Sequence, residues 1–491
     1  MPAFPKNPVI YEINTFVWLQ QLSGKYGRRI DLTNVPSVEW DAIGKLECDA
    51  VWLMGVWQRS PAGRKVALGL PDLISEFGRI LPGFTADDIP GSGYSIKAYE
   101  VDERLGSVGE AREQLRQRGL KLILDFVPNH VATDHAWVTE HPEYFVQASE
   151  RELAAAPENY FSAAGNVLAY GRDPYFPPWT DTAQVNAFAP GYRRAALDTL
   201  REISTQCDGV RCDMAMLLLT DIFKKTWGDA AGAMPKSEYW TEMIQGVRRS
   251  RPDFLFIAEA YWDLEWNLQQ LGFDYCYDKR LYDRLIHDDA AAIRAHLGAD
   301  LQYQNKLIRF LENHDEKRAA AALAPARHRA AAVAIATLAG AILYYDGQFC
   351  GSKLKIPVQL GRAPAERCDE SFSEFYSQIR RVTKTVKSGD ATWKLCPAEG
   401  WSDNETAKNL LSWCWEGPGG RFLVVINFAG ASSQGRVRLP WANLAGKQWR
   451  VSSLVGSDVF ERDGTELRSD GFYVGLEPWQ YYVLQFEERV S

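Results

Sequence analysis

The sequence has no uninterrupted stretch of about 18 apolar residues, the length that a membrane-spanning helix needs. At its N-terminus it also lacks a basic segment followed by an apolar stretch and a small-residue cleavage site, so we expect no secretory signal. The net charge of −8 disfavours a surface that binds phosphate groups. We therefore expect neither a membrane nor a nucleic acid as a partner.

Motifs for metal or redox chemistry are missing as well. The eight cysteines are scattered without a CxxC pair, and no Cys/His set has the spacing of a zinc site. From this pattern we expect reduced thiols and a cytoplasmic location. We also expect no cofactor and no catalytic metal.

What the sequence does contain is a repeated apolar strand followed by an amphipathic helix. Eight strands are predicted, at residues 9–13, 50–54, 120–127, 209–213, 254–260, 273–277, 306–311 and 341–345. Helical patterns separate most of them, at residues 107–118, 192–205, 237–251, 279–287 and 327–339. This alternation predicts parallel strands in an α/β fold, and eight units indicate a (β/α)8 TIM barrel. A doubly wound open sheet is the alternative, but the Gly-rich phosphate loop that it usually carries is absent.

Two long gaps interrupt the repeat. Residues 60–91 are rich in glycine and proline, and the second gap includes the aromatic segment DPYFPPWTD. Insertions of this length usually shape an active site or form a small subdomain. We predict a catalytic barrel over residues 1–130 and 190–389 and an inserted subdomain on the strand-three loop over residues 131–189. The short strands of residues 390–491 predict a C-terminal antiparallel β-sandwich domain.

Polar side chains follow four of the predicted strands at their carboxyl ends, where barrel enzymes carry their catalytic groups. They are Asp125, Asn129, His130, Arg211, Asp213, Glu259, Asn313, His314 and Asp315. Cleavage of a glycosidic bond needs one carboxylate that attacks the anomeric carbon and one carboxylic acid that protonates the leaving oxygen. Arg211 and Asp213 share one face of their strand, and a neighbouring cation lowers the pKa of a carboxylate and keeps it nucleophilic.

Four short motifs around these residues resemble those of the α-amylase superfamily of retaining α-glycoside hydrolases and transglycosidases. DFVPNH, GVRCD, IAEA and ENHD occur in the order that this family shows. The resemblance implies that Asp213 is the nucleophile, that Glu259 is the general acid/base with a raised pKa, and that Asp315 grips the distorted sugar. It also implies double displacement on an α-glucan or α-linked gluco-oligosaccharide, by hydrolysis or by glycosyl transfer.

The resemblance extends to sugar contacts. Tyr94, in SGYSIKAY, is similar to the family's stacking residue in the subsite of the cleaved sugar. The other predicted contacts are His130, Arg211, His314, Asp125, Trp57 and Trp262, of which Asp125 has a structural role as its alternative. Asn129 is interpreted as a loop cap. A structural calcium ion there is the alternative, although no dense carboxylate cluster accompanies it.

The sequence also departs from the family pattern. Met216 and Leu217 stand where many starch-cleaving relatives carry Lys-His, and Ser95 follows the stacking tyrosine where glucose-trimming relatives carry Asp. Asp346 and Gln348 stand where relatives often show Gly-Glu. These departures predict an unusual acceptor side. The alternative function is therefore that of a transglycosidase or disaccharide isomerase, such as a glucanotransferase or a trehalose-forming enzyme. A non-catalytic amylase-like binding protein is the second alternative, and an unrelated metal-dependent barrel enzyme is the third.

Overall fold

The computed structural model describes residues 4–489, which divide into two compact units. The first unit holds residues 4–5, Ile10–Tyr277 and Leu354–Glu366. The second holds Lys6–Val9, Asp278–Lys353 and residues 367–489. Among the residues described, no helix has the length and apolar character that crossing a membrane requires.

Eight parallel strands close into a barrel in the order β1-β15-β14-β13-β12-β11-β5-β2. They are β1 (Val9–Asn14), β2 (Ala50–Met54), β5 (Lys121–Phe126), β11 (Gly209–Cys212), β12 (Leu255–Ala258), β13 (Tyr275–Tyr277), β14 (Leu307–Arg309) and β15 (Ala341–Tyr345). Almost every residue in them is buried, as expected for parallel strands covered on both faces. The predicted barrel is confirmed, and the open doubly wound sheet is excluded.

The pairing of neighbouring barrel strands determines which residues lie level at their carboxyl ends. Arg211 on β11 lies level with Asp125 on β5. Just beyond the strands, the Asp213 N–H donates to the Phe126 carbonyl at 2.8 Å, and the Glu259 N–H donates to the Cys212 carbonyl at 3.1 Å. These bonds fix the backbone that carries both predicted catalytic carboxylates.

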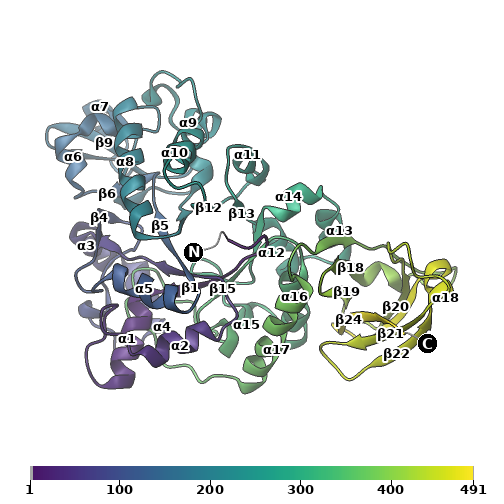
Figure 1. The fold of residues 1–491 in the computed structure, drawn as a ribbon. Helices are drawn as coiled ribbons and strands as arrows, with labels where there is room; N and C mark the ends of the chain where they lie inside the picture. The colour runs from purple at the N-terminus through teal and green to yellow at the C-terminus, as the bar shows by residue number, and fades with distance from the viewer. Residues whose placement is uncertain (1–3, 490–491) are drawn as a thin grey trace. The chain divides into compact units, whose positions relative to one another are not determined.

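The five predicted helices are present, with ends that differ by a few residues. They are α5 (Val108–Gln117), α8 (Pro190–Gln206), α10 (Tyr239–Arg248), α12 (Lys279–His287) and α16 (Pro325–Thr337). In α5, Val108, Ala111 and Leu115 are buried on one face, and the Ser107 hydroxyl caps the first turn. Helices α8 and α10 lie side by side in the first unit (Figure 1).

Residues 60–91 contain two helices, which were not predicted because the segment is rich in glycine and proline. α3 (Pro61–Gly69) and α4 (Pro71–Ile80) each begin with a proline at the first helical position, where its missing N–H costs nothing. Phe77 and Ile80 pack with Ile356 and Leu360 of the segment Leu354–Glu366 in a small apolar core.

An ion pair also holds the segment Leu354–Glu366. The Arg362 guanidinium binds Asp88 through two contacts of 2.6 and 2.9 Å. Hydrogen bonding from Arg362 is the main reason why the pKa of Asp88 falls to about 2. Arg362 is therefore an anchor of this segment.

The insertion after β5 forms its own antiparallel sheet, in the order β6-β10-β9-β7, with β8 paired to β9. Its strands are β6 (His130–Ala132), β7 (Gln147–Ala148), β8 (Tyr160–Ala163), β9 (Asn166–Gly171) and β10 (Trp179–Gln184). Because β6 follows β5 closely and pairs with β10, the insertion is tied to the carboxyl end of a barrel strand.

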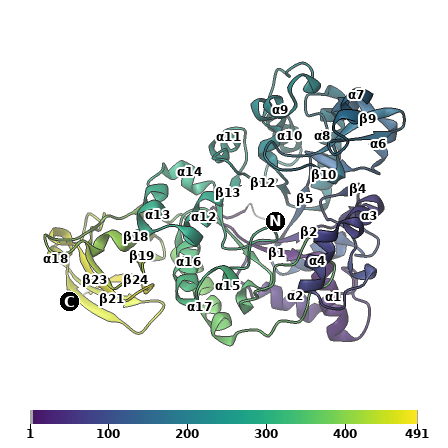
Figure 2. The same cartoon turned by 180° about the vertical axis from the view of Figure 1, so that it is seen from behind.

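The C-terminal part of the second unit contains two antiparallel sheets (Figure 2). One has the order β16-β18-β19-β24-β21-β22, and the other β17-β20-β23. The strands are β16 (Thr392–Leu395), β17 (Ala398–Glu399), β18 (Leu410–Gly417), β19 (Gly420–Asn427), β20 (Ser433–Val437), β21 (Gln448–Ser453), β22 (Val459–Asp463), β23 (Phe472–Leu476) and β24 (Tyr481–Glu488). Leu423 on β19 and Val474 on β23 belong to one buried cluster, so the two sheets share a core. The predicted antiparallel C-terminal domain is confirmed.

Two cysteines are joined, and for these two the expectation of reduced thiols is wrong. Cys350 and Cys368 form a disulfide across 18 positions of sequence. The other six cysteines form no disulfide in the described part of the chain. The cytoplasmic location stays a prediction, without the support of fully reduced thiols.

Removing this disulfide lowers stability. A closed loop of this size restricts the unfolded chain by about 3 kcal/mol on the chain-entropy estimate. We expect Cys350→Ser/Cys368→Ser to lose about that much free energy of unfolding in a urea titration without reductant. Dithiothreitol should lower the wild type to the level of the variant and leave the variant unchanged. Equal stability of both proteins without reductant would contradict this expectation.

Candidate active site

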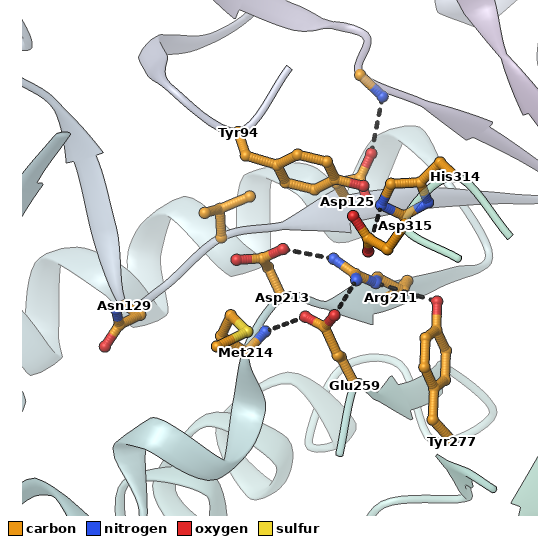
Figure 3. A network of polar contacts seen from close by, with 12 residues as sticks. Tyr94, Asp125, Asn129, Arg211, Asp213, Met214, Glu259, Tyr277, His314 and Asp315 are labelled. Carbon is orange, nitrogen blue, oxygen red and sulfur yellow. Dashed lines mark hydrogen bonds and ion pairs between the residues drawn. The ribbon is translucent and has the colours of Figure 1, made fainter. Parts of the chain in front are cut away.

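The site in the first unit is built around Arg211 on β11. Its side chain is 1% exposed, and one guanidinium nitrogen donates to Asp213 Oδ1 at 2.6 Å. The second terminal nitrogen lies 2.9 Å from Glu259 Oε1, and Nε lies 3.3 Å from the Tyr277 hydroxyl. Figure 3 shows Arg211 between the two carboxylates. One buried cation therefore holds both predicted catalytic groups of this unit.

The surroundings keep Arg211 charged. Burial alone lowers the pKa of this guanidinium, but the charge of Glu259, interactions with Tyr277 and Tyr94, and the charge of Asp213 raise it well above its ordinary value. The rings of Tyr94 and Tyr277 lie 5.3 and 5.6 Å from the guanidinium carbon, a distance at which an aromatic ring attracts a cation.

Glu259 follows β12 and is surrounded by donors. The Met214 N–H donates to Oε2 at 2.6 Å, and the Tyr261 hydroxyl donates to Oε1 at 2.8 Å. Met214 has φ of 45°, a left-handed conformation that is costly for a residue with a side chain. This strained residue, which directly follows Asp213, aims its N–H at Glu259. These donors hold the Glu259 carboxyl in position, and its raised pKa stays a prediction.

His130 and Tyr94 lie together. Burial lowers the pKa of His130 to about 4, and a hydrogen bond to the Tyr94 backbone partly offsets this effect. The imidazole is therefore neutral at pH 7. Its ring lies 5.1 Å from the ring of Trp179 on β10, while Tyr94 is half-buried and lies against Arg211.

Asp125 and Trp57 form the buried support beneath the site. Asp125 is fully buried, and its Oδ2 accepts the Gly55 N–H at 2.8 Å. Trp57 is also fully buried and donates from Nε1 to the Asp125 carbonyl at 2.7 Å. The hypothesis that Trp57 lines a sugar subsite is wrong, because its ring has no exposed surface. The geometry of Asp125 fits the structural alternative.

Asn129 is hydrogen-bonded to Gln184 of the insertion. Its Oδ1 accepts from Gln184 Nε2 at 3.1 Å, and its carbonyl accepts from the same nitrogen at 2.9 Å. Within residues 4–489 no group of three or more Asp, Glu, His or Cys is arranged to hold a metal ion. Calcium also takes oxygens of Asn side chains and backbone carbonyls, so the structural calcium ion stays an alternative to the loop-cap prediction.

Four of the five residues that depart from the family pattern are buried, and Asp346 is partly exposed. Met216 is 0% exposed and Leu217 is 3% exposed, so neither offers a surface to a sugar. Ser95 is 1% exposed, and its hydroxyl donates to the Asp181 carbonyl at 2.8 Å. In the second unit, Gln348 is 1% exposed and bonds to the Tyr376 hydroxyl at 3.0 Å.

His314 and Asp315 belong to the second unit and follow β14. His314 Nε2 lies 3.0 Å from Asp315 Oδ2, and the Asp315 side chain is 41% exposed. The Asn313 side chain accepts the N–H groups of Asp315 and Glu316 at 2.9 Å each, which fixes this turn. Their action together with Asp213 and Glu259 stays a prediction.

Two contributors to the site were missed by sequence reasoning. Tyr277 ends β13 with its hydroxyl on Arg211, and its place at a strand end was the available signal. Met214 contributes through its backbone alone, and no residue type signals that. Tyr261 also contributes, because its hydroxyl bonds directly to Glu259.

Comparison with known proteins gives consistent matches. The family model described as alpha amylase, catalytic domain, matches residues 39–375. Alpha-amylase MalA of Haloarcula japonica is 25% identical over 95% of this chain, which spans 64% of that relative's length.

Solved structures share the fold. The maltogenic alpha-amylase AmyB from Thermotoga neapolitana has a TM-score of 0.67 and 17% identity, with 98% of this chain and 99% of that one covered. The trehalose-6-phosphate hydrolase TreA from Bacillus licheniformis has a TM-score of 0.65 and 15% identity, with coverage of 98% and 99%.

The bridge made by Arg211 predicts a pH-dependent loss of stability. Arg211→Met leaves two buried carboxylates without their cation, which costs about 3–5 kcal/mol at pH 7. The folded variant then binds protons more readily than its unfolded chain, so its stability rises as the pH falls from 7 to 5. Urea unfolding at both pH values measures this change.

Arg248→Met is the matched control. Arg248 makes a partly exposed ion pair with Asp274 at 2.6 Å, and such pairs contribute about 1 kcal/mol or less. A loss for Arg211→Met that equals the control, or that does not change with pH, would contradict the role of Arg211.

Proposed function

The chain belongs to the α-amylase family, whose catalytic-domain model matches most of it, and on that premise we propose that it is a retaining α-glycosidase acting on α-linked gluco-oligosaccharides. Membership supports the chemistry of a glycoside hydrolase. The observation that carries the finer proposal is the Arg211 bridge between Asp213 and Glu259. Because both carboxylates contact the same guanidinium, they lie close together. This fits the separation of about 5 Å between the two catalytic carboxyl groups of a retaining glycosidase.

In the first step Asp213 attacks the anomeric carbon. Arg211 keeps Asp213 ionised, because a buried cation at 2.6 Å stabilises the carboxylate over the acid. Glu259, protonated at this stage, gives its proton to the glycosidic oxygen as the bond to the leaving sugar breaks. A covalent glycosyl ester on Asp213 results.

In the second step Glu259 acts as a base. It removes a proton from water or from a sugar hydroxyl, whose oxygen attacks the anomeric carbon and displaces Asp213. Two inversions retain the configuration of the product. The Met214 N–H and the Tyr261 hydroxyl suit this stage, because they stabilise the Glu259 carboxylate left after the first proton transfer.

Tyr94, His130, His314 and Asp315 have sugar-binding roles in this proposal. Tyr94 stacks on the cleaved sugar, and the neutral His130 and the His314 side chain bind hydroxyl groups. Asp315 grips hydroxyls of the distorted ring, and its partly exposed carboxylate supports such a contact.

A transglycosidase or a disaccharide isomerase is the second candidate. Met216 and Leu217 are buried, so the position that often carries Lys-His presents no polar group to an acceptor. The non-catalytic alternative is weaker, because the catalytic residues are held by a buried ion-pair network rather than left as scattered remnants.

Substrates with different leaving groups distinguish the role of Glu259 from that of Asp213. Glu259→Gln removes the acid and lowers kcat on maltotetraose by about 10²–10⁴-fold. The same variant should still consume α-maltosyl fluoride in the presence of azide, because fluoride leaves without a proton and azide attacks without a base. Asp213→Asn should lose both activities. Chromatography of the products measures each.

The fold of both variants is checked by thermal unfolding. Each substitution is isosteric, so the melting temperatures should remain close to that of the wild type. Full activity of Glu259→Gln on maltotetraose, or consumption of α-maltosyl fluoride by Asp213→Asn at the wild-type rate, would contradict the assignment. The wild-type profile on maltose, maltooligosaccharides, trehalose and sucrose distinguishes hydrolysis from transfer.

A further inference from the structure

Residues 354–366, which contain KIPVQLGR, form a strap that belongs to the first unit, although the chain on both sides of it belongs to the second. The Leu354 N–H donates to Glu366 Oε1 at 3.3 Å, so the two ends of the strap are held together. Ile356 and Leu360 anchor its middle in the apolar core that they share with α4. The strap is thus closed at its ends and fixed to the first unit.

Polar contacts of the strap converge on residues 88–91. The Gly361 N–H donates to the Asp88 carbonyl at 2.8 Å, and the Arg362 guanidinium binds the Asp88 carboxylate at 2.6 and 2.9 Å. Pro90 lies so close that a Cβ on Gly361 would come within 3.0 Å of its ring. The strap therefore fixes both the backbone and the side chains of this stretch.

Arg59, at the end of β3 (Trp57–Arg59), joins the strap to the end of the same stretch. The residue is 3% exposed, and its Nη1 donates to the carbonyls of Gly91 and Val358 at 2.5 and 3.3 Å. Burial lowers the pKa of Arg59 to about 9, so the guanidinium stays charged at pH 7. Hydrogen bonds from a charged donor are stronger than neutral ones. One buried cation thus ties Gly91 to the strap.

Gly91 leads directly into the loop that carries Tyr94. Gly91 has φ of 98°, a conformation that only glycine adopts readily, so the chain turns here. A Cβ on Gly93 would lie 3.2 Å from the Gly55 Cα, so the loop packs closely on neighbouring backbone. The ring of Tyr94 lies 5.3 Å from the guanidinium carbon of Arg211 (Figure 3). The position of this ring in the site therefore depends on where Gly91 is held.

We propose that the strap positions Tyr94 for the cleaved sugar, with Arg362 and Arg59 as positioning residues. This inference rests on the proposed function, in which Tyr94 stacks on that sugar. A ring that is already in place binds more tightly, because a mobile one loses conformational entropy when the sugar arrives. Both arginines act through residues 88–91 and not on the sugar itself. The strap thus determines how tightly the site binds a sugar and leaves the chemistry of the carboxylates unchanged.

Arg362→Met removes the contact with Asp88 and leaves the buried Arg59 in place. We expect it to raise KM for maltotetraose about five-fold and to keep kcat within about two-fold, as the loss of uniform binding does. The same rise is expected with α-maltosyl fluoride, because both substrates place a sugar against Tyr94. Arg362→Lys, which keeps the charge but not the planar two-pronged contact, should give an intermediate KM. Initial rates measure both constants.

A double-mutant cycle with Tyr94→Ala tests whether Arg362 acts through Tyr94. In the Tyr94→Ala background, Arg362→Met should change KM for α-maltosyl fluoride by less than about two-fold, because the ring that it positions is gone. The reactive fluoride keeps the rate of this impaired background measurable. Equal rises in KM in both backgrounds would overturn the proposal, since Arg362 would then act independently of Tyr94.

Hydrogen exchange of the peptide that contains residues 88–95, followed by mass spectrometry, tests the strap without relying on activity. Arg362→Met should speed exchange in this peptide about ten-fold, because it loosens the contacts that hold the loop. Arg438→Met is the matched control and should leave this exchange and KM unchanged. Arg438 is about as exposed as Arg362 and pairs with Glu399 at 2.8 Å. Thermal unfolding checks that each variant is folded at the assay temperature.

The outcomes separate the strap from the proposed function. Unchanged KM or unchanged exchange of residues 88–95 in Arg362→Met would overturn the positioning role and leave the double displacement standing. A wild type that consumes neither substrate, together with faster exchange in Arg362→Met, would overturn the proposed function and leave the strap's hold on the Tyr94 loop standing.

Discussion

The catalytic site depends on one buried cation, Arg211. Its guanidinium holds Asp213 at 2.6 Å and Glu259 at 2.9 Å, from strands that pair side by side in the barrel. Without it, two carboxylates would face each other in a site of low dielectric, and their repulsion would favour the uptake of a proton by one of them. The nucleophile, Asp213, must stay ionised, and Arg211 favours its ionised form. Glu259 must lose and regain a proton, and the Met214 N–H and the Tyr261 hydroxyl stabilise it when it is ionised.

Much of the fold could be predicted because its signals are local. Parallel barrel strands are buried on both faces, so each appears as a short apolar run, and all eight runs proved to be strands. Asp213 and Glu259 follow such runs directly, so the barrel topology already predicts that both lie at its carboxyl end. The pairing of Arg211 with Asp213 follows from their spacing of two residues along one strand.

The errors concern properties that depend on contacts distant in sequence. Trp57 has the aromatic side chain of a sugar platform, but it is buried under Asp125. The prolines of residues 60–91 suggested a loop, yet two of them begin helices. Cys350 and Cys368 carry no motif that would pair them across 18 positions. The contact between Tyr175 and Trp262 joins an insertion to a strand-end loop, and only the folded chain reveals it.

In the proposed mechanism Asp213 forms a covalent bond to the sugar while Glu259 serves as the acid/base. The most direct measurement incubates the protein with an α-glucosyl fluoride that carries a second fluorine on its ring, which slows the breakdown of the intermediate. Mass spectrometry of the peptic digest then locates the label. The account predicts one fluoroglucosyl group per chain, on the peptide that contains Asp213, and none in Asp213→Asn. A label on another carboxylate, or turnover of the reagent by Asp213→Asn at the wild-type rate, would contradict it.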